Sequence, residues 1–250
     1  GIVMKISLEL LLACLAFFVS FNVTAIEPDW TTYNQLLKDY VKVGVTDDIP
    51  LNTVNYSEMH RDKRFKQVVK QLEFYDVSQL DNKNERLSFY INAYNIFALK
   101  MVIDHWEVKS IKNIGSFFSP VWKKPVGKLN GKMVSLHHVE HEVLRKMDDP
   151  RIHLAIVCAS VSCPDLRNEA YAARQLDQQL DNQSLLFLQN TKKGLFIKGN
   201  TAHVSKIFGW FKKDFKKQGG VKSYINHYVP LADNIEIDAD INYNWLVNKN

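Results

Sequence analysis

The sequence predicts an α+β fold: a single helix-rich domain, over residues 26–250, packed on a small mixed or antiparallel sheet. Three observations support this class. Helical apolar periodicity dominates the first half, two Asn/Gly dipeptides signal hairpins, and strands do not alternate regularly with helices as a doubly wound sheet requires. The 250 residues suffice for one full hydrophobic core. A hydrophobic content of 46% and a mean hydropathy of -0.22 exclude a polytopic membrane protein.

Apolar residues at helical spacing predict most of the secondary structure. Ser135 is placed to cap a helix that ends near Met147, before the stop signal Asp148-Asp149-Pro150. The other helices are expected over residues 30–43, 61–75, 84–105, 173–189, 207–215 and 221–228.

Turn dipeptides and short apolar runs predict the strands. Asn130-Gly131 centres a hairpin over residues 126–134, and Gly199-Asn200 centres a second one over 195–204. Further strands are expected over 152–157 and 234–239, with a polar turn over 44–51 and a loop over 108–121.

The first 25 residues have the pattern of a signal peptide: a short positive start, an apolar run and small residues before Ile26. The run from Ile6 to Val19 is shorter than the roughly 20 residues that span a bilayer. We therefore expect cleavage, no membrane-spanning segment in the mature chain and a periplasmic or secreted bacterial protein. Cys14 lies in a lipobox-like sequence, so a lipoprotein anchored through Cys14 is the alternative.

The formal net charge of +5 is weak support for a polyanionic partner. The densest basic run lies between Lys206 and Lys217, where lysines are interleaved with aromatic residues. A helix with an aromatic core face and a solvated lysine face explains this run, so no nucleic-acid partner is predicted.

The loop after the predicted strand 152–157 is the first candidate site, because it carries Cys158, Ser160, Ser162 and Cys163. Small polar residues at the end of a buried strand commonly bind ligands. In an exported protein the two thiols, five positions apart, also invite a disulfide. A local disulfide or a buried inert cysteine is therefore the structural alternative to a reactive thiol.

The predicted helix 84–105 is apolar on nearly all sides, yet it contains Asn92 and Asn95 on one face. A buried Asn without hydrogen-bond partners costs about 1–3 kcal/mol, so the two amides imply a local polar network. That network either ties the helix to a neighbouring backbone or belongs to a site.

The helix after Ser135 begins with His137, His138, Glu140 and His141. Imidazoles one turn apart can share a metal, but the glutamate position does not match the H-E-x-x-H motif, and a further ligand such as His153 or a thiolate would be needed. We therefore predict no metal and no cofactor. The alternative is acid–base chemistry, in which His141 activates a thiol and an amide or carboxylate orients the imidazole.

Three motifs occur in order along the chain. Residues 90–95 read Y-I-N-x-Y-N, residues 135–141 read S-L-x-x-V-E-H, and residues 149–167 read D-P-R-I-H-x-A-x-V-C-A-S-x-x-C-P-x-L-R. With these motifs the chain resembles the bacterial and plant family known as domain of unknown function 547 (DUF547), over about residues 88–228. The resemblance implies a common fold unit and a shared set of residues rather than a reaction.

Two details of the resemblance bear on the candidate site. Residues 137 and 138 are histidines where family members commonly have acidic residues, which argues against a metal role as a family property. Some plant members lack the second thiol position, which favours Cys158 over Cys163 as the essential thiol and weakens the disulfide alternative.

The first functional hypothesis is an exported thiol-dependent hydrolase or acyltransferase, papain-like or transglutaminase-like in its chemistry. It assigns the nucleophile to Cys158 or, failing that, Cys163, the base to His141, and the orienting group to Asn95, with Asn92 or Asp214 as alternatives.

The second hypothesis is a non-catalytic module that binds a small anionic or peptide ligand. Its ligand-binding residues are Asn92, Glu140, Ser160, Arg167 and Asp214, with Asn95 and His141 in the same pocket and Arg167 as the fork for an anion. A disulfide between the two thiols would favour this hypothesis. A redox role is a third, weaker alternative, because the spacing is not C-x-x-C.

Overall fold

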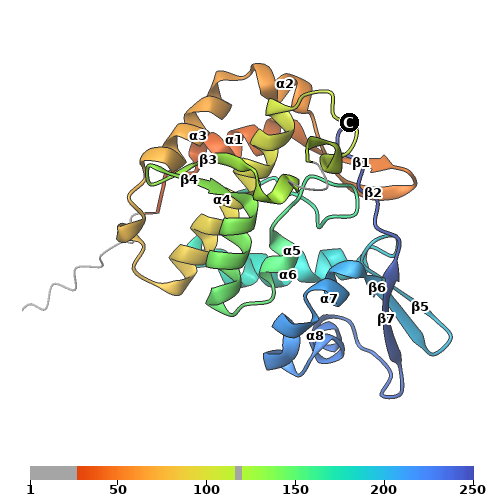
Figure 1. Ribbon diagram of the computed structural model, residues 1–250. Helices are drawn as coiled ribbons and strands as arrows, with labels where there is room; N and C mark the ends of the chain where they lie inside the picture. The colour runs from red at the N-terminus through yellow and green to blue at the C-terminus, as the bar shows by residue number, and fades with distance from the viewer. Residues whose placement is uncertain (1–26, 116–119) are drawn as a thin grey trace, which may run out of the picture.

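A computed structural model describes residues 27–115 and 120–250. The predicted signal peptide and Cys14 lie outside these residues. The central element is helix α4 (Lys83–Asp104), which runs through the middle of the protein and is buried on nearly all sides (Figure 1). Asn82 and Glu85 form a capping box at its start, so α4 begins within one residue of the predicted position.

The N-terminal helices cover one side of α4. They are α1 (Thr31–Tyr40), α2 (Tyr56–Arg61) and α3 (Lys63–Phe74). The helix predicted to extend to residue 43 ends at Tyr40, because the next residues form an antiparallel hairpin of β1 (Val41–Thr46) and β2 (Ile49–Val54). The β-branched alternation of that stretch favours a strand over a fourth helical turn.

The predicted Asn130-Gly131 hairpin is confirmed as β3 (Pro125–Leu129) and β4 (Lys132–Ser135), with φ of 47° and 73° at the two turn residues. The Ser135 hydroxyl accepts a hydrogen bond from the His138 N–H, as expected for an N-cap. The helix that follows is not a regular α-helix. It is a π-helical segment, η4 (His138–Val143), followed by a 3-10 turn, η5 (Leu144–Met147).

The strand predicted over residues 152–157 is wrong. The segment begins as a short helix, α5 (Ile152–Ala155), and continues as extended chain that joins no sheet. A short run in which five of six residues are apolar does not distinguish a buried strand from a buried helical turn. The side chain of Asn95 supplies the hydrogen bonds that a neighbouring strand would have made, because it bonds the Ala155 carbonyl and the Val157 N–H.

The C-terminal part surrounds a second hydrophobic cluster. It contains α6 (Leu176–Gln189), β5 (Leu195–Lys198), β6 (Thr201–Ser205), α7 (Lys206–Trp210), η7 (Lys212–Gln218), α8 (Val221–Tyr228) and β7 (Glu236–Ile241). Strands β5 and β6 are antiparallel and β7 is parallel to β6, so this sheet is mixed. In the lysine-rich run, Phe208 and Phe215 are buried and most of the lysines are exposed, as predicted.

The last residues of the chain return to the centre of the protein. Ser162 N donates to Asn244 O, Val161 N donates to Leu246 O, and the Asn248 N–H donates to Ala159 O. This C-terminal segment, residues 243–248, therefore pairs with the loop that carries the two cysteines. The pairing fixes Tyr243 and Trp245 beside that loop.

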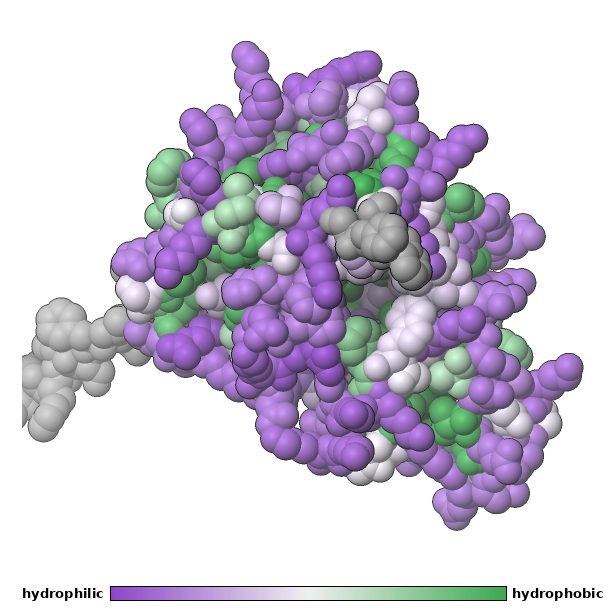
Figure 2. Space-filling model, in the orientation of Figure 1, coloured by the Kyte–Doolittle hydropathy of each residue, from purple (hydrophilic) through white to green (hydrophobic). Residues whose placement is uncertain are grey.

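The α+β prediction is confirmed, with the strands of the described residues divided among small antiparallel and mixed sheets. Short 3-10 turns complete the chain: η1 (Val77–Gln79), η2 (Ile111–Ile114), η3 (Val121–Lys123) and η6 (Ala173–Gln175). Hydrophilic side chains cover most of the visible face, with hydrophobic residues in patches between them (Figure 2). Within residues 27–115 and 120–250, no helix combines the length and apolar character needed to cross a bilayer.

Candidate functional site

A cavity of about 270 Å³ lies where α4, η4, α5, α7 and the C-terminal segment meet the loop of residues 158–163, called the cysteine loop below. Aromatic rings form most of its wall. Its polar groups include Tyr94, Glu140 and the histidines His137, His141 and His153, whereas His138 does not border it. Both cysteines of the cysteine loop border it. Five of the predicted site residues are thus at or beside one cavity: Glu140, His141, Cys158, Cys163 and, through a hydrogen bond to His153, Asp214.

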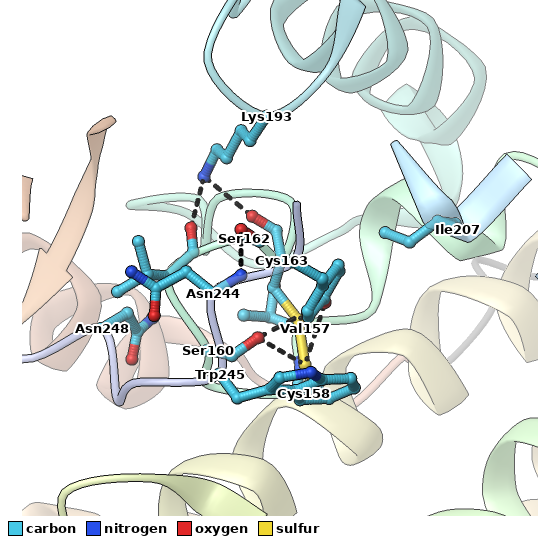
Figure 3. Close-up of a disulfide and its surroundings, with 12 residues drawn as sticks. Val157, Cys158, Ser160, Ser162, Cys163, Lys193, Ile207, Asn244, Trp245 and Asn248 are labelled. Carbon is cyan, nitrogen blue, oxygen red and sulfur yellow. Dashed lines mark hydrogen bonds between the residues drawn. A yellow bond between two sulfur atoms is a disulfide. The ribbon is translucent and has the colours of Figure 1, made fainter. Parts of the chain in front are cut away.

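The two thiols are joined in a disulfide, Cys158–Cys163. In this state neither sulfur is a nucleophile. Figure 3 shows the bond with Ser160 beside it and the ammonium of Lys193 directed at the backbone carbonyls of the loop. Lys193 is buried, bonds the Cys163 carbonyl at 2.8 Å and pairs with Asp165 at 2.6 Å, so it holds the loop closed from the side away from the cavity.

Glu140 is the polar group at the floor of the cavity. Its side chain is only 13% exposed, and this burial raises its pKa to about 7, with the charge of Asp214 acting in the same direction and Arg145 and the hydrogen bond from Tyr94 opposing it. A carboxyl group with such a pKa exchanges protons near neutral pH, as a general acid or base must.

His141 lies next to Glu140, but its imidazole is not held as a catalytic base requires. The Arg145 guanidinium, which can only donate, bonds His141 Nδ1 at 2.8 Å. The neutral ring therefore carries its proton on Nε2, which lies 3.9 Å from a Glu140 oxygen. Burial lowers the pKa of His141, with His137 and Arg145 adding to the effect, so the neutral form is favoured. His141 thus presents an N–H to the cavity floor.

His153 is the second imidazole beside Glu140, and it is almost completely buried. Its Nε2 bonds Asp214 at 2.8 Å, and Asp214 is held in turn by a two-pronged ion pair with Arg145. Burial lowers the pKa of His153 to about 4, although Asp214 acts in the opposite direction. The neutral ring donates through Nε2, so Nδ1 is a bare acceptor, and it faces Glu140 at 4.0 Å without a hydrogen-bond partner.

The aromatic wall comes from three separate parts of the chain. Trp122, Trp210, Tyr243 and Trp245 form a continuous group, with ring centroids 4.4 Å apart for Tyr243 and Trp245 and 5.7 Å apart for Trp210 and Trp245. Trp210 is 50% exposed, so the wall is accessible from solvent. Sequence reasoning missed Tyr243 and Trp245, because only the backbone pairing of the C-terminal segment brings them here.

The two buried asparagines do not reach the cavity. Asn92 donates to the Tyr171 carbonyl and accepts from the Tyr171 N–H, and Asn95 makes the corresponding pair of bonds to Ala155 and Val157. Each amide is therefore occupied by backbone. This corrects the expectation that Asn95 orients His141 and that Asn92 contacts a ligand.

The two remaining predicted residues lie at different distances from the site. Ser160 is buried behind the disulfide, with its hydroxyl 3.1 Å from Cys158 Sγ and 3.3 Å from the Tyr243 hydroxyl. Arg167 bonds Asn182 and pairs with Glu169, away from the residues that border the cavity, so the expected anion fork does not form there.

Among the side chains of residues 27–115 and 120–250, the group close enough to share an ion is His203, Asp238 and Asp240, on β6 and β7. None of the three borders the cavity.

Residues 77–188 match the family model described as "Protein of unknown function, DUF547". This matched part of the chain, residues 77–188, is called the DUF547 segment below. Neither a curated protein nor a solved structure matches the chain. The resemblance derived from the sequence motifs is therefore confirmed, although the matched segment begins earlier and ends earlier than the predicted residues 88–228.

The DUF547 segment contains the polar floor of the cavity and the disulfide: Tyr94, Glu140, His141, His153, Cys158 and Cys163 all lie within residues 77–188. Asp214 and three of the four clustered rings lie beyond it. The signals that located the floor were the Glu-His pair after Ser135 and the cysteine loop, both of which are part of the sequence motifs.

Proposed function

We propose that the cavity binds a small organic cation, either a free ammonium compound or the basic side chain of a peptide. The observation that carries this proposal is the pairing of a continuous aromatic wall with the buried carboxyl group of Glu140. Aromatic faces attract ammonium groups by about 0.5–2 kcal/mol each, more when the ligand is desolvated. A volume of about 270 Å³ suits a ligand or side chain of few atoms.

The charge of the lining supports a cation over the anion expected from the sequence. His141 and His153 favour their neutral forms, and the guanidinium of Arg145 is neutralised by Asp214. Glu140 is the group in the floor that becomes charged near neutral pH. A bound cation would favour the ionised carboxylate, so binding and ionisation of Glu140 should strengthen each other.

The test compares choline with its neutral isostere 3,3-dimethylbutanol, using calorimetry and tryptophan fluorescence. Choline should bind at least about tenfold more tightly, and its affinity should rise as the pH passes through about 7 and Glu140 ionises. The Trp210→Leu variant should lose binding, whereas Trp106→Leu, which removes a similarly exposed tryptophan elsewhere, should retain it. Equal affinity for the two probes, or no binding of either, would contradict the proposal.

A thiol-dependent hydrolase or acyltransferase is the second candidate. The observation in its favour is that Cys158, once reduced, would face the same cavity as Glu140. The geometry around His141 counts against a papain-like triad, because Arg145 rather than Asn95 contacts its Nδ1. Reduced protein should then hydrolyse p-nitrophenyl acetate with a burst that Cys158→Ser abolishes and Cys163→Ser retains. Reduced protein without a burst would exclude this candidate.

Export of the protein remains a proposal that depends on the pattern of residues 1–25. Mass spectrometry of the protein recovered from a bacterial host should show a mature chain that begins near Ile26 in the periplasm or medium. A mature chain that begins with a lipid-modified Cys14 would instead support the lipoprotein alternative.

A further inference from the structure

The two cysteines of the disulfide differ in their exposure to solvent. Cys163 is buried, with 3% of its surface exposed, whereas Cys158 is partly exposed at the cavity. A thiolate that enters the cavity therefore meets Cys158 Sγ first. Exchange at a disulfide requires such access to one sulfur and a stabilised leaving group at the other.

The buried sulfur has the hydrogen-bond donors that a leaving thiolate needs. The Cys158 N–H donates to Cys163 Sγ at 3.1 Å, and the Tyr243 hydroxyl lies at 3.1 Å from the same atom. The Ser160 hydroxyl donates to the Tyr243 oxygen at 3.3 Å, which leaves the Tyr243 proton free to point at sulfur. Tyr243 is farther from Cys158 Sγ, at 3.5 Å. Burial keeps the pKa of Tyr243 well above its usual value, so the hydroxyl remains a donor at physiological pH.

We propose that the Cys158–Cys163 disulfide is an exchangeable oxidant for a low-molecular-weight thiol that enters the aromatic cavity. The incoming thiolate forms a bond to Cys158 Sγ, the Cys158–Cys163 bond breaks, and its electron pair passes to Cys163 Sγ, where the two donors stabilise the charge. A second thiolate attacks the outer sulfur of the mixed disulfide and releases Cys158 as a thiolate. Two external thiols are oxidised to one disulfide, the protein disulfide is reduced, and the two protons from the external thiols end on the protein thiols.

This activity does not depend on the cation proposed above, because it needs only access to Cys158 and the donors at Cys163. The buried Lys193 ties the loop carbonyls from the other side, so the loop can keep its place while the disulfide opens. Hydrogen bonds to the thiolate also favour the reduced pair at equilibrium, which makes the disulfide an oxidant.

The first experiment measures reduction of the folded full-length protein by reduced glutathione, followed by mass spectrometry. Tyr243→Phe removes the hydroxyl donor and should slow reduction about tenfold and shift the equilibrium towards the disulfide. Tyr224→Phe, which removes a buried hydroxyl bonded to Ser184, is the matched control and should react like the wild type. Thermal unfolding confirms that each variant is folded. A wild-type disulfide inert to glutathione, or a Tyr243→Phe variant that reacts at the wild-type rate, overturns the proposal.

The second experiment identifies the sulfur that is attacked. Folded Cys163→Ser protein, which keeps the exposed thiol, should form a mixed disulfide with oxidised glutathione. Folded Cys158→Ser protein should form it at least about tenfold more slowly, because Cys163 is buried. Equal rates for the two variants would overturn the assignment of Cys158 as the attacked sulfur. Neither readout requires a cationic ligand, so a failure here is distinguishable from a failure of choline binding.

Discussion

Replacement of Glu140 by Gln tests the electrostatics of the cavity floor directly. Burial raises the pKa of Glu140 from 4.5 to about 7, so the folded state holds the proton more tightly than the unfolded state does. A raised folded-state pKa favours folding below the unfolded-state pKa, and this contribution is lost as the pH rises through the folded-state pKa. Ionised Glu140 should therefore destabilise the wild type above about pH 7, and Gln, which cannot ionise, should remove that effect.

The size of the effect follows from the difference between the two pKa values. Each pKa unit corresponds to about 1.4 kcal/mol, so the shift from 4.5 to about 7 predicts about 3 kcal/mol. His153 works in the opposite direction over nearly the same range. Its pKa is lowered to about 4, so its contribution to stability is present above about 6.5 and is lost as the pH falls towards 4. The contributions of Glu140 and His153 to the free energy of unfolding partly cancel in the wild type. The pH dependence of wild-type stability alone therefore does not reveal either contribution.

The assay is urea unfolding followed by circular dichroism, for wild type and Glu140→Gln, at several pH values between about 4.5 and 8. The difference in free energy of unfolding should move by about 3 kcal/mol in favour of the variant across this range, because the variant has no carboxyl group to ionise at this position. Glu142→Gln is the matched control: Glu142 is exposed on the same helix and paired with Lys146, which lowers its pKa, so its small effect has the opposite sign. A flat difference between wild type and Glu140→Gln would refute the reasoning.

Two further predictions concern the framework of the site. Asn95→Ala should lower the free energy of unfolding by about 2–5 kcal/mol, because it leaves the Ala155 carbonyl and the Val157 N–H buried without partners; urea unfolding measures this, and a loss below about 1 kcal/mol would contradict the role. The double change Cys158→Ser and Cys163→Ser should lower the free energy of unfolding by at most about 2 kcal/mol, because the disulfide closes a short loop. The thermal midpoint should therefore fall only modestly. Failure of the double variant to fold would show that the disulfide does more than close this loop.

Local signals in the sequence were sufficient for most of the fold. Asn130-Gly131 supplies the positive φ values of a tight turn, so the hairpin around it is predictable from two residues. Ser135 likewise marks the start of its helix through a hydrogen bond that spans only three residues. Such features depend on neighbours in the chain, and the long buried helix α4 follows from its long apolar run in the same way.

The errors arose where distant contacts decide the structure. The apolar run after Pro150 forms a helical turn because Asn95, far away in the sequence, replaces the hydrogen bonds of a neighbouring strand. The same bonds remove Asn95 from the candidate site. Tyr243 and Trp245 reach the cavity only because the C-terminal segment pairs with the cysteine loop, more than 80 positions earlier. No local pattern specifies a pairing of that kind.

The cavity joins two parts of the chain that have different tasks. The DUF547 segment supplies the carboxyl group, the imidazoles and the disulfide, and the residues after it supply most of the aromatic wall. The C-terminal segment connects them, because its backbone bonds the cysteine loop while Tyr243 contributes both a ring to the wall and a hydroxyl to Cys163 Sγ. A ligand that packs against Tyr243 therefore also contacts the group that stabilises the leaving sulfur. Coupling between two sites is reciprocal. Opening the disulfide should therefore change the free energy of ligand binding at the aromatic wall by the same amount by which a bound ligand changes the free energy of opening the disulfide.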